Sequence, residues 1–445
     1  MKKNPMEALQ NHGKSLLQRL LITIQLFGRH GMANHAAAGA YGFLLSAVPA
    51  LLLISIFLLA ALRSSPKAVA DLIMSINFLK STFEEESLIA IFQTAVKPGI
   101  PGLISVISII WAARIFALSL QRGLKIIFSG GGLTGNSTEK KRNPLMDNAI
   151  IFLIEFLVIV FALVILLCSQ TAVRFYEALG YRMASSPLFV TISRHINIIV
   201  PAVGLVLISY IFYRIVPARS PSRRAAITGA LTCTVLYGII SFFIRLFINQ
   251  ARYNVLYGAL GGLILMLVNV YFFFILFFFG AQLAYVIDSF DVLLFSKLRY
   301  IRSETPHSRN LVERKIFSAA DGHLRKYIRS YKKGETVFFE GDNGQEIYYL
   351  ISGAADIYLQ NTPESPMEKI SSFNPGVFFG EMSYLLSEQR TATVMARTDM
   401  VVMVLPPAMF DEVLRSDPAT ARTIIENLSF RLKTTNQKIA KIMGE

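Results

Sequence analysis

A glycine, a glutamate and an arginine near the C-terminus have the spacing of an anion-binding site. Gly380 precedes a short helical segment that Glu381 opens and Leu386 ends, and Arg390 follows nine positions after Glu381. The first turn of a helix has unpaired N–H groups and the positive end of a dipole, so it attracts an anion. A guanidinium binds two phosphate oxygens at once, which an ammonium group cannot do. The segment therefore predicts a phosphate site.

Glu381 narrows the kind of ligand that this site would accept. A lone carboxylate next to an anion would repel it, so Glu381 fits only if it faces hydroxyl groups. A ribose 2′-OH is the obvious donor. The three residues together predict a ligand with both a phosphate and a sugar.

Short strands surround this segment, between two helical stretches. A helix-like stretch ends near Ser330, and helical periodicity returns from Pro406 through Lys441. Between them, runs of apolar residues bounded by turn residues predict strands. They lie within 334–342, in two parts of 346–359, and at 367–373, 392–396 and 399–404.

This run of strands resembles the cyclic-nucleotide-binding domain over about residues 313–440. The most specific part is similar to that family's phosphate-binding cassette and reads FFGEMSYLLSEQRTATVMA, residues 378–396. Tyr384 stands at a usually aliphatic position and Gln389 replaces the common proline, but neither change removes a ligand group. The resemblance implies cAMP or cGMP as a regulatory ligand and leaves the choice between them open.

The resemblance also assigns a role to each residue of the cassette. It implies that Glu381 contacts the ribose and that Thr391 approaches the purine. It implies that Arg390 holds the cyclic phosphate together with the backbone near Met382 and Ser383, where the chain leaves Gly380.

The part of the chain before residue 290 has the composition of a membrane protein. Hydrophobic residues make up 53% of the whole chain and charged residues 16%, against about 25% charged in a soluble domain. Because backbone groups in hydrocarbon have no water to bond, about 20 consecutive apolar residues predict a spanning helix. Six such runs lie near 38–62, 100–118, 148–169, 196–216, 226–248 and 259–287. We expect an α-helical membrane bundle of about six transmembrane helices, followed by a C-terminal β-roll flanked by helices.

Charged residues in the connections predict the orientation of the bundle. Lys and Arg dominate the N-terminal stretch and the connections after the second and fourth runs, whereas the loop after the first run balances both signs. The positive-inside rule therefore places both termini in the cytoplasm. The net charge of +15 has the same explanation, so we expect a lipid bilayer and no nucleic acid polymer as partner.

Five polar residues lie in or near the apolar runs: Arg114, Glu155, Arg245, Asn269 and Gln282. Polar side chains in a membrane face the bundle interior by default and can mark a pathway. One interpretation pairs Glu155 with Arg114 or Arg245 in a polar cavity. In the alternative, both arginines reach towards an interface and Glu155 makes a structural hydrogen bond.

Three segments resemble the YihY/BrkB family of bacterial inner-membrane proteins over roughly residues 15–290. They are NHAAAGAYGFLLSAVPALLL, YRIVPARSPSRRAAITGAL and YGALGGLILMLVNVYFFFILFFFGAQLAYVID. The resemblance implies a six-span bundle in the bacterial inner membrane. Members have also carried a ribonuclease label, which nothing in this chain supports because its six histidines are scattered. We expect no metal site, no catalytic residue, no cofactor and no enzyme activity.

Four parts follow along the chain. Residues 1–35 form an N-terminal cytoplasmic segment, 36–290 the transmembrane domain, 291–312 a cytoplasmic linker and 313–445 the cyclic-nucleotide-binding domain. Residues 14–30 show helical spacing of apolar residues, which predicts either an amphipathic helix on the inner leaflet or a buried packing helix.

Two functions remain after these predictions. The first is a transport or permeation protein whose activity responds to a cyclic nucleotide. The second is a non-transporting scaffold or envelope factor that uses the domain as a sensor or interaction module. A cation channel is disfavoured, because only about ten residues between Ile248 and Ala259 would have to hold a pore helix and filter. Homo-oligomer formation is left open.

Overall fold

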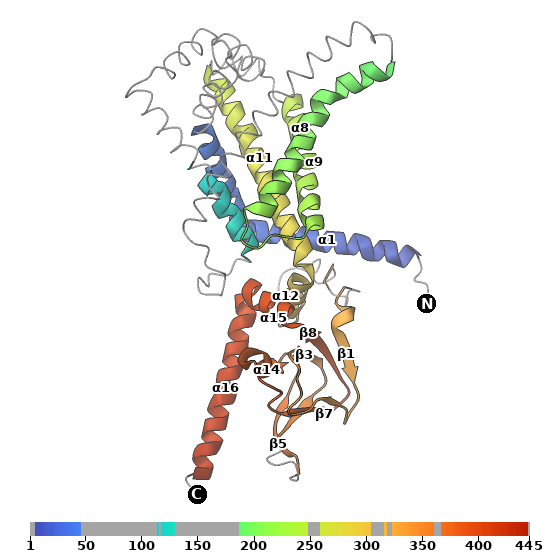
Figure 1. The fold of residues 1–445 in the computed structure, drawn as a ribbon, viewed down its shortest axis with the longest axis vertical. Helices are drawn as coiled ribbons and strands as arrows, with labels where there is room; N and C mark the ends of the chain where they lie inside the picture. The colour runs from blue at the N-terminus through green and yellow to red at the C-terminus, as the bar shows by residue number, and fades with distance from the viewer. Residues whose placement is uncertain are drawn as a thin grey trace, which may run out of the picture. The chain divides into compact units, whose positions relative to one another are not determined.

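The computed structural model describes residues 5–45, 114, 117–129, 187–247, 259–303, 316–317, 323–359 and 366–443 (Figure 1). They belong to two compact units. The C-terminal unit consists of Met1–Arg19, Gly130–Leu133 and Ser289–Glu445, and the helical unit of Leu20–Ser129 and Thr134–Asp288.

Long apolar helices form the helical unit. They are the C-terminal part of α1 (Pro5–Arg29), helical segments at 32–45 and 117–128, α8 (Pro187–Ile215), α9 (Arg223–Phe247) and α11 (Ala259–Asp288). Helix α9 packs against both α8 and α11. Three other segments also meet α11: Phe27 contacts Phe279, the backbone at Gly39 lies close to the Phe274 ring, and Phe128 contacts Tyr285. Helix α11 is therefore the central packing element of the described part of this unit.

Glycines allow α9 and α11 to approach closely. A Cβ atom added at Gly229 would lie 2.4 Å from the carbonyl oxygen of Gly280, and one added at Gly280 would lie 2.6 Å from the carbonyl oxygen of Gly229. Small residues at such crossings bring helix backbones together where lipid supplies no hydrophobic drive. Nearby, the Tyr213 hydroxyl donates to the Phe277 carbonyl at 2.6 Å.

We predict that Gly229→Ala lowers the free energy of unfolding by about 1–3 kcal/mol, because the new methyl group overpacks this crossing. Gly238→Ala is the matched control, since it lies in the same helix and an added Cβ would meet nothing within 4 Å. Thermal unfolding of the purified protein in detergent measures both variants. If Gly229→Ala and Gly238→Ala unfold at the same midpoint temperature, the close approach of α9 and α11 at Gly229 is contradicted.

Two helices in the described part of the chain are long and apolar enough to cross a membrane, Arg223–Ile244 and Ile264–Asp288, and Pro201–Ile215 is a shorter apolar helix. They correspond to the last three predicted runs. Most of the first three runs, 38–62, 100–118 and 148–169, lies outside the described residues. The bundle of six spans therefore stays a prediction.

Two four-stranded antiparallel sheets form the core of the C-terminal unit (Figure 1). Their orders are β1-β8-β3-β6 and β2-β7-β4-β5. The strands are β1 (Ile328–Tyr331), β2 (Thr336–Phe338), β3 (Ile347–Ser352), β4 (Ala355–Leu359), β5 (Glu368–Phe373), β6 (Phe378–Phe379), β7 (Thr393–Ala396) and β8 (Met400–Leu405). Both sheets contribute to one apolar core, in which Phe379 stacks on Tyr348 and Phe373.

Helices surround the two sheets: α12 (Phe290–Ser303), the 3-10 helix η1 (Arg325–Tyr327), α14 (Glu381–Leu386), α15 (Pro407–Ser416) and α16 (Pro418–Met443). The predicted strands are confirmed, but some boundaries were wrong. The stretch near Ser330 is strand β1, because its backbone pairs with β8. The C-terminal helix is broken at Asp417, before Pro418, whose ring disfavours helical backbone at the preceding residue.

Candidate functional site

Helix α14 begins at Gly380 because that residue has a left-handed backbone conformation. Its φ is 77°, a region that glycine enters without the steric cost that a Cβ atom brings. The predicted helix from Glu381 to Leu386 is confirmed. Strand β6 leads directly into Gly380, so pairing of β6 with β3 fixes where the first turn of α14 starts.

Arg390 reaches back to the start of this helix. Its NH1 group donates to the Gly380 carbonyl at 2.7 Å and to Ser383 Oγ at 2.8 Å. Its NH2 group donates to the carbonyl of Glu346 at 2.8 Å. The side chain is only 3% exposed, and its Nε atom is buried with no hydrogen-bond partner among the described residues. The Nε–H donor is therefore unsatisfied in the described part of the site.

Aromatic rings support the guanidinium from one side. Its carbon lies 4.3 Å from the centre of the Phe338 ring and 5.6 Å from that of Tyr348. Burial lowers the pKa of Arg390, and the neighbouring Tyr348 and acidic groups such as Glu346 oppose that change. Because arginine stays protonated in proteins, the site keeps a positive charge on a rigid platform.

Two glycines leave room for the guanidinium. A Cβ atom at Gly344 would lie 2.9 Å from the NH2 group of Arg390, and one at Gly380 would lie 2.8 Å from its NH1 group. Any larger residue at either position would displace the arginine. Gly380 was predicted from the sequence, whereas Gly344 was missed because it lies 46 positions before Arg390 in a loop without a helical or strand signal.

The structure brings most of the predicted cassette residues together. Glu381 and Ser383 are buried, and the Ser383 hydroxyl donates to the carbonyl of Gly344 at 3.1 Å. The side chains of Met382 and Thr391 lie on the surface. The main addition to the predicted site is the wall made by Gly344, Glu346 and the aromatic rings.

The predicted polar residues of the membrane domain are only partly described. Asn269 accepts a 3.4 Å hydrogen bond from the Tyr237 hydroxyl, and Gln282 Oε1 lies 3.1 Å from His30 Nδ1. Arg114 is helical and exposed. Glu155 and the side chain of Arg245 lie outside the described residues, so their pairing stays a prediction.

Comparison with known proteins shows the family to which the chain belongs. The sequence profile described as "Virulence factor BrkB" matches residues 23–292, which is more than half of the chain. The chain belongs to the BrkB family. A second profile, described as "Cyclic nucleotide-binding domain", matches residues 328–417. This BrkB-family chain therefore carries a cyclic nucleotide-binding domain that contains Gly380, Glu381 and Arg390.

Curated relatives match about a quarter of the BrkB-family chain. It is 37% identical over 114 residues to a "cAMP-dependent protein kinase regulatory subunit" of Colletotrichum orbiculare, covering 26% of each chain. It is 33% identical over 96 residues to the protein of the same description in Dictyostelium discoideum, covering 22% of this chain and 29% of that one. The match thus spans less than a third of either relative. The Thermus thermophilus catabolite activator protein is 26% identical, with 26% of this chain and 54% of that chain covered and a TM-score of 0.24.

Within the cyclic nucleotide-binding domain of this BrkB-family chain, Tyr384 links α14 to α15. Its hydroxyl donates to Asp411 Oδ1 at 2.6 Å, and its ring packs edge-on against Phe410. The hydrogen bond to Asp411, followed by burial, raises the pKa of Tyr384 to about 12. The folded protein therefore holds this proton more tightly than the unfolded chain, whose tyrosine pKa is about 10. The stabilisation is complete below about pH 10 and is lost as pH rises towards 12.

We predict that Tyr384→Phe lowers the free energy of unfolding by about 1 kcal/mol at pH 7, because Asp411 loses a hydrogen bond. Between pH 8 and pH 11 the variant should lose less stability than the wild type. Urea unfolding at several pH values measures both effects. Tyr358→Phe, on the outer face of β4, is the control, and an equal loss in it would contradict a specific role for the Tyr384 bond.

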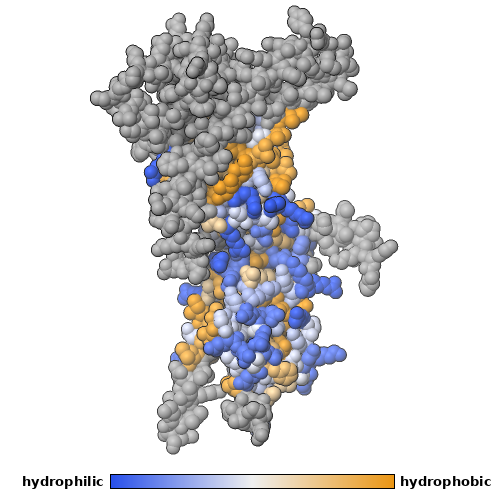
Figure 2. Space-filling view, viewed as in Figure 1, coloured by the Kyte–Doolittle hydropathy of each residue, from blue (hydrophilic) through white to orange (hydrophobic). Residues whose placement is uncertain are grey.

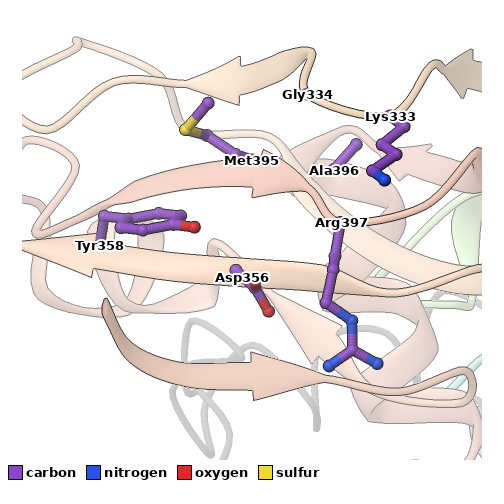
Figure 3. Close-up of a pocket in the computed structure, with 7 residues that line it drawn as sticks. All are labelled: Lys333, Gly334, Asp356, Tyr358, Met395, Ala396 and Arg397. Atoms are coloured by element: carbon purple, nitrogen blue, oxygen red, sulfur yellow. The ribbon is translucent and has the colours of Figure 1, made fainter. Parts of the chain in front are cut away.

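A separate hollow of about 220 Å³ lies on the sheet that contains β4 and β7 (Figure 3). Its lining residues are Lys333, Gly334, Asp356, Tyr358, Met395, Ala396 and Arg397. Burial acts to raise the pKa of Asp356, but hydrogen bonds from Lys369 and Ser372, at 2.7 Å each, and the positive charges nearby lower it overall. Met395 and Ala396, at the end of the 378–396 cassette, line this hollow, whereas Gly380, Glu381 and Arg390 do not.

Proposed function

We propose that this chain is a membrane transport or permeation protein whose activity is regulated by cAMP or cGMP bound at the cassette. The observation that carries the proposal is the buried guanidinium of Arg390, held at the start of α14 with its Nε donor unused among the described residues. A buried cation with a spare donor is suited to a monoanionic ligand.

Each cassette residue has a separate task in this proposal. Arg390 and the first N–H groups of α14 bind the exocyclic oxygens of the cyclic phosphate. Glu381 accepts a hydrogen bond from the ribose 2′-OH, which a carboxylate does more strongly than a neutral group. Thr391, on the exposed edge of the site, approaches the base. The proposal assigns no chemical step to the chain.

Helix α12 provides a route from the cassette towards the membrane part. Its Phe295 contacts Phe378 of β6, the strand that leads into Gly380, with ring centres 6.2 Å apart. Its Arg299 pairs with Asp417 between α15 and α16 at 3.3 Å. Only Ser289 separates α12 from α11 along the chain. A rearrangement at the cassette can therefore shift α12, and ligand coupling of this kind is typically about 1–3 kcal/mol.

Reconstitution tests the regulated transport. Purified protein in liposomes should change the flux of a solute when cAMP or cGMP is added to the side that bears the C-terminal unit. Phe295→Ala lies outside the cassette, so it should keep nucleotide binding while reducing the nucleotide-dependent change in flux. If nucleotide binds but no solute tested ever moves, and a protein partner is captured only with nucleotide present, the scaffold alternative replaces transport.

The proposal includes a location. We place the chain in the bacterial inner membrane as a multi-pass protein with both termini in the cytoplasm. The excess of Lys and Arg in the connections supports this orientation. The location is also consistent with the ligand, since cyclic nucleotides are made inside cells.

A further inference from the structure

Helix α1 exposes a stripe of large apolar residues and buries several polar residues. Its exposed apolar residues are Leu16, Leu17, Leu20 and Ile24, which form the apolar face of α1. Leu16 is 65% exposed and Ile24 is 51% exposed. By contrast, the buried residues of this helix include the polar Ser15, Gln18 and Thr23 as well as the apolar Ile22. An amphipathic helix in water buries its apolar stripe instead.

The buried polar side of α1 is bound by other parts of the C-terminal unit. Ser15 Oγ lies 3.2 Å from His323 Nε2, and the Gln18 side-chain amide donates to the carbonyl of Ile316 at 3.0 Å. The guanidinium of Arg19 lies 4.6 Å from the centre of the Phe290 ring. These contacts fix the rotation of the helix, so the apolar face cannot turn inward without breaking them.

We propose that the apolar face of α1 binds a lipid surface. Leaving apolar area in water costs about 25 cal/mol per Å², so four exposed large side chains on one stripe need an apolar partner. Besides Arg19, which packs on Phe290, helix α1 carries Lys14 and Arg29, and its one acidic residue is Glu7. Cations beside an apolar stripe match the anionic headgroups and acyl chains of a membrane surface.

The exposed surface of the helical unit supports lipid over a second protein copy. Helices α8 and α9 likewise expose large apolar residues, among them Leu207, Leu231 and Phe242 (Figure 2 shows such surface in orange). The chain that carries these exposed apolar faces belongs to the BrkB family, whose resemblance implies a membrane protein. Because α1 presents the same kind of apolar surface, lipid is the partner that we assign to it.

Site-specific fluorescence in the full chain tests this inference. An environment-sensitive probe is attached at Leu20→Cys, and separately at Ile24→Cys, after both native cysteines are replaced by alanine. The protein is placed in bilayer discs that contain phosphatidylglycerol and spin-labelled lipid. The lipid reference is Phe242→Cys, and the aqueous reference is Arg422→Cys, whose side chain is 82% exposed.

We expect probes at both α1 positions to lose most of their emission to spin-labelled lipid, as at Phe242, and to resist quenching by aqueous iodide. Quenching by iodide as strong as at Arg422, with no effect of the lipid label, would overturn the inference. Protection from both quenchers would also overturn it, because a protein surface would then cover the face. Since these side chains are exposed, their replacement should not impair folding, and two positions guard against a local artefact.

Discussion

Arg390→Ala should weaken cyclic nucleotide binding by about 2–5 kcal/mol, which corresponds to about 30-fold to several thousand-fold in the dissociation constant. The reason is that the cyclic phosphate would enter a buried site without its counter-charge. Arg390→Lys should recover only part of the loss, because an ammonium group keeps the charge but cannot reproduce the fork that binds Gly380, Ser383 and Glu346. Calorimetric titration of the purified full chain measures both variants.

Arg397→Ala is the matched control for this result. Arg397 is an exposed arginine of the same unit, seven positions further along, and it lines the hollow in Figure 3. Its loss should leave nucleotide affinity unchanged. If Arg397→Ala weakens binding and Arg390→Ala does not, the nucleotide occupies the hollow, and the assignment of the cassette is wrong. Thermal unfolding of each variant tests whether misfolding accounts for a loss of nucleotide affinity.

Glu381→Gln should weaken binding of a ribonucleotide by about 1.5–3 kcal/mol, because a charged acceptor of the ribose hydroxyl becomes a neutral one. The sharper result concerns the 2′-deoxy analogue. Wild-type protein should bind the deoxy nucleotide much more weakly than the ribonucleotide, whereas Glu381→Gln should bind the two with similar affinity. Competition against a fluorescent cyclic nucleotide measures all four affinities.

Comparing wild type and Glu381→Gln with both nucleotides isolates the contact between Glu381 and the ribose 2′-OH. A loss that the variant shows equally for both nucleotides would mean that Glu381 supports the fold of α14 and does not touch the sugar. That alternative is physically reasonable, since Glu381 is 1% exposed at the first position of the helix, where a carboxylate also stabilises the helix dipole. The variant also keeps the size of the side chain, so it leaves no cavity.

The sequence predicted six of the eight described strands, all except β1 and β6, and the short helix that begins after Gly380. Gly380, Glu381 and Arg390 were predictable because helix-start chemistry and phosphate chemistry both act over short distances along the chain. The strands were predictable because Ile347–Ser352 and Ala355–Leu359 are apolar runs separated by a turn at Gly353. The family and the domain were both indicated by local motifs, and the two profile matches confirm them.

Long-range contacts could not be predicted in the same way. Gly344 and Glu346 lie near Arg390 because β3 pairs with β6. Strand β6 has only two residues, which is too short for an alternating hydrophobic pattern to appear in the sequence. Most of α12 falls in the linker predicted at 291–312. The packing role of this helix becomes visible only in the structure, where its Phe295 contacts Tyr349 and Phe378. For α1 the sequence left two environments open, and its exposed apolar residues are the basis of the proposal that it binds lipid.

Comparative titration of the wild-type chain with cAMP, cGMP and 5′-AMP is the most direct test of nucleotide sensing. One guanidinium and one helix start suit a single negative charge, whereas 5′-AMP carries about two at pH 7. We predict saturable binding of at least one cyclic nucleotide and binding of 5′-AMP that is at least about tenfold weaker, a difference of about 1.4 kcal/mol. If neither cyclic nucleotide binds, or if 5′-AMP binds as tightly as both, the chain is not a cyclic nucleotide sensor.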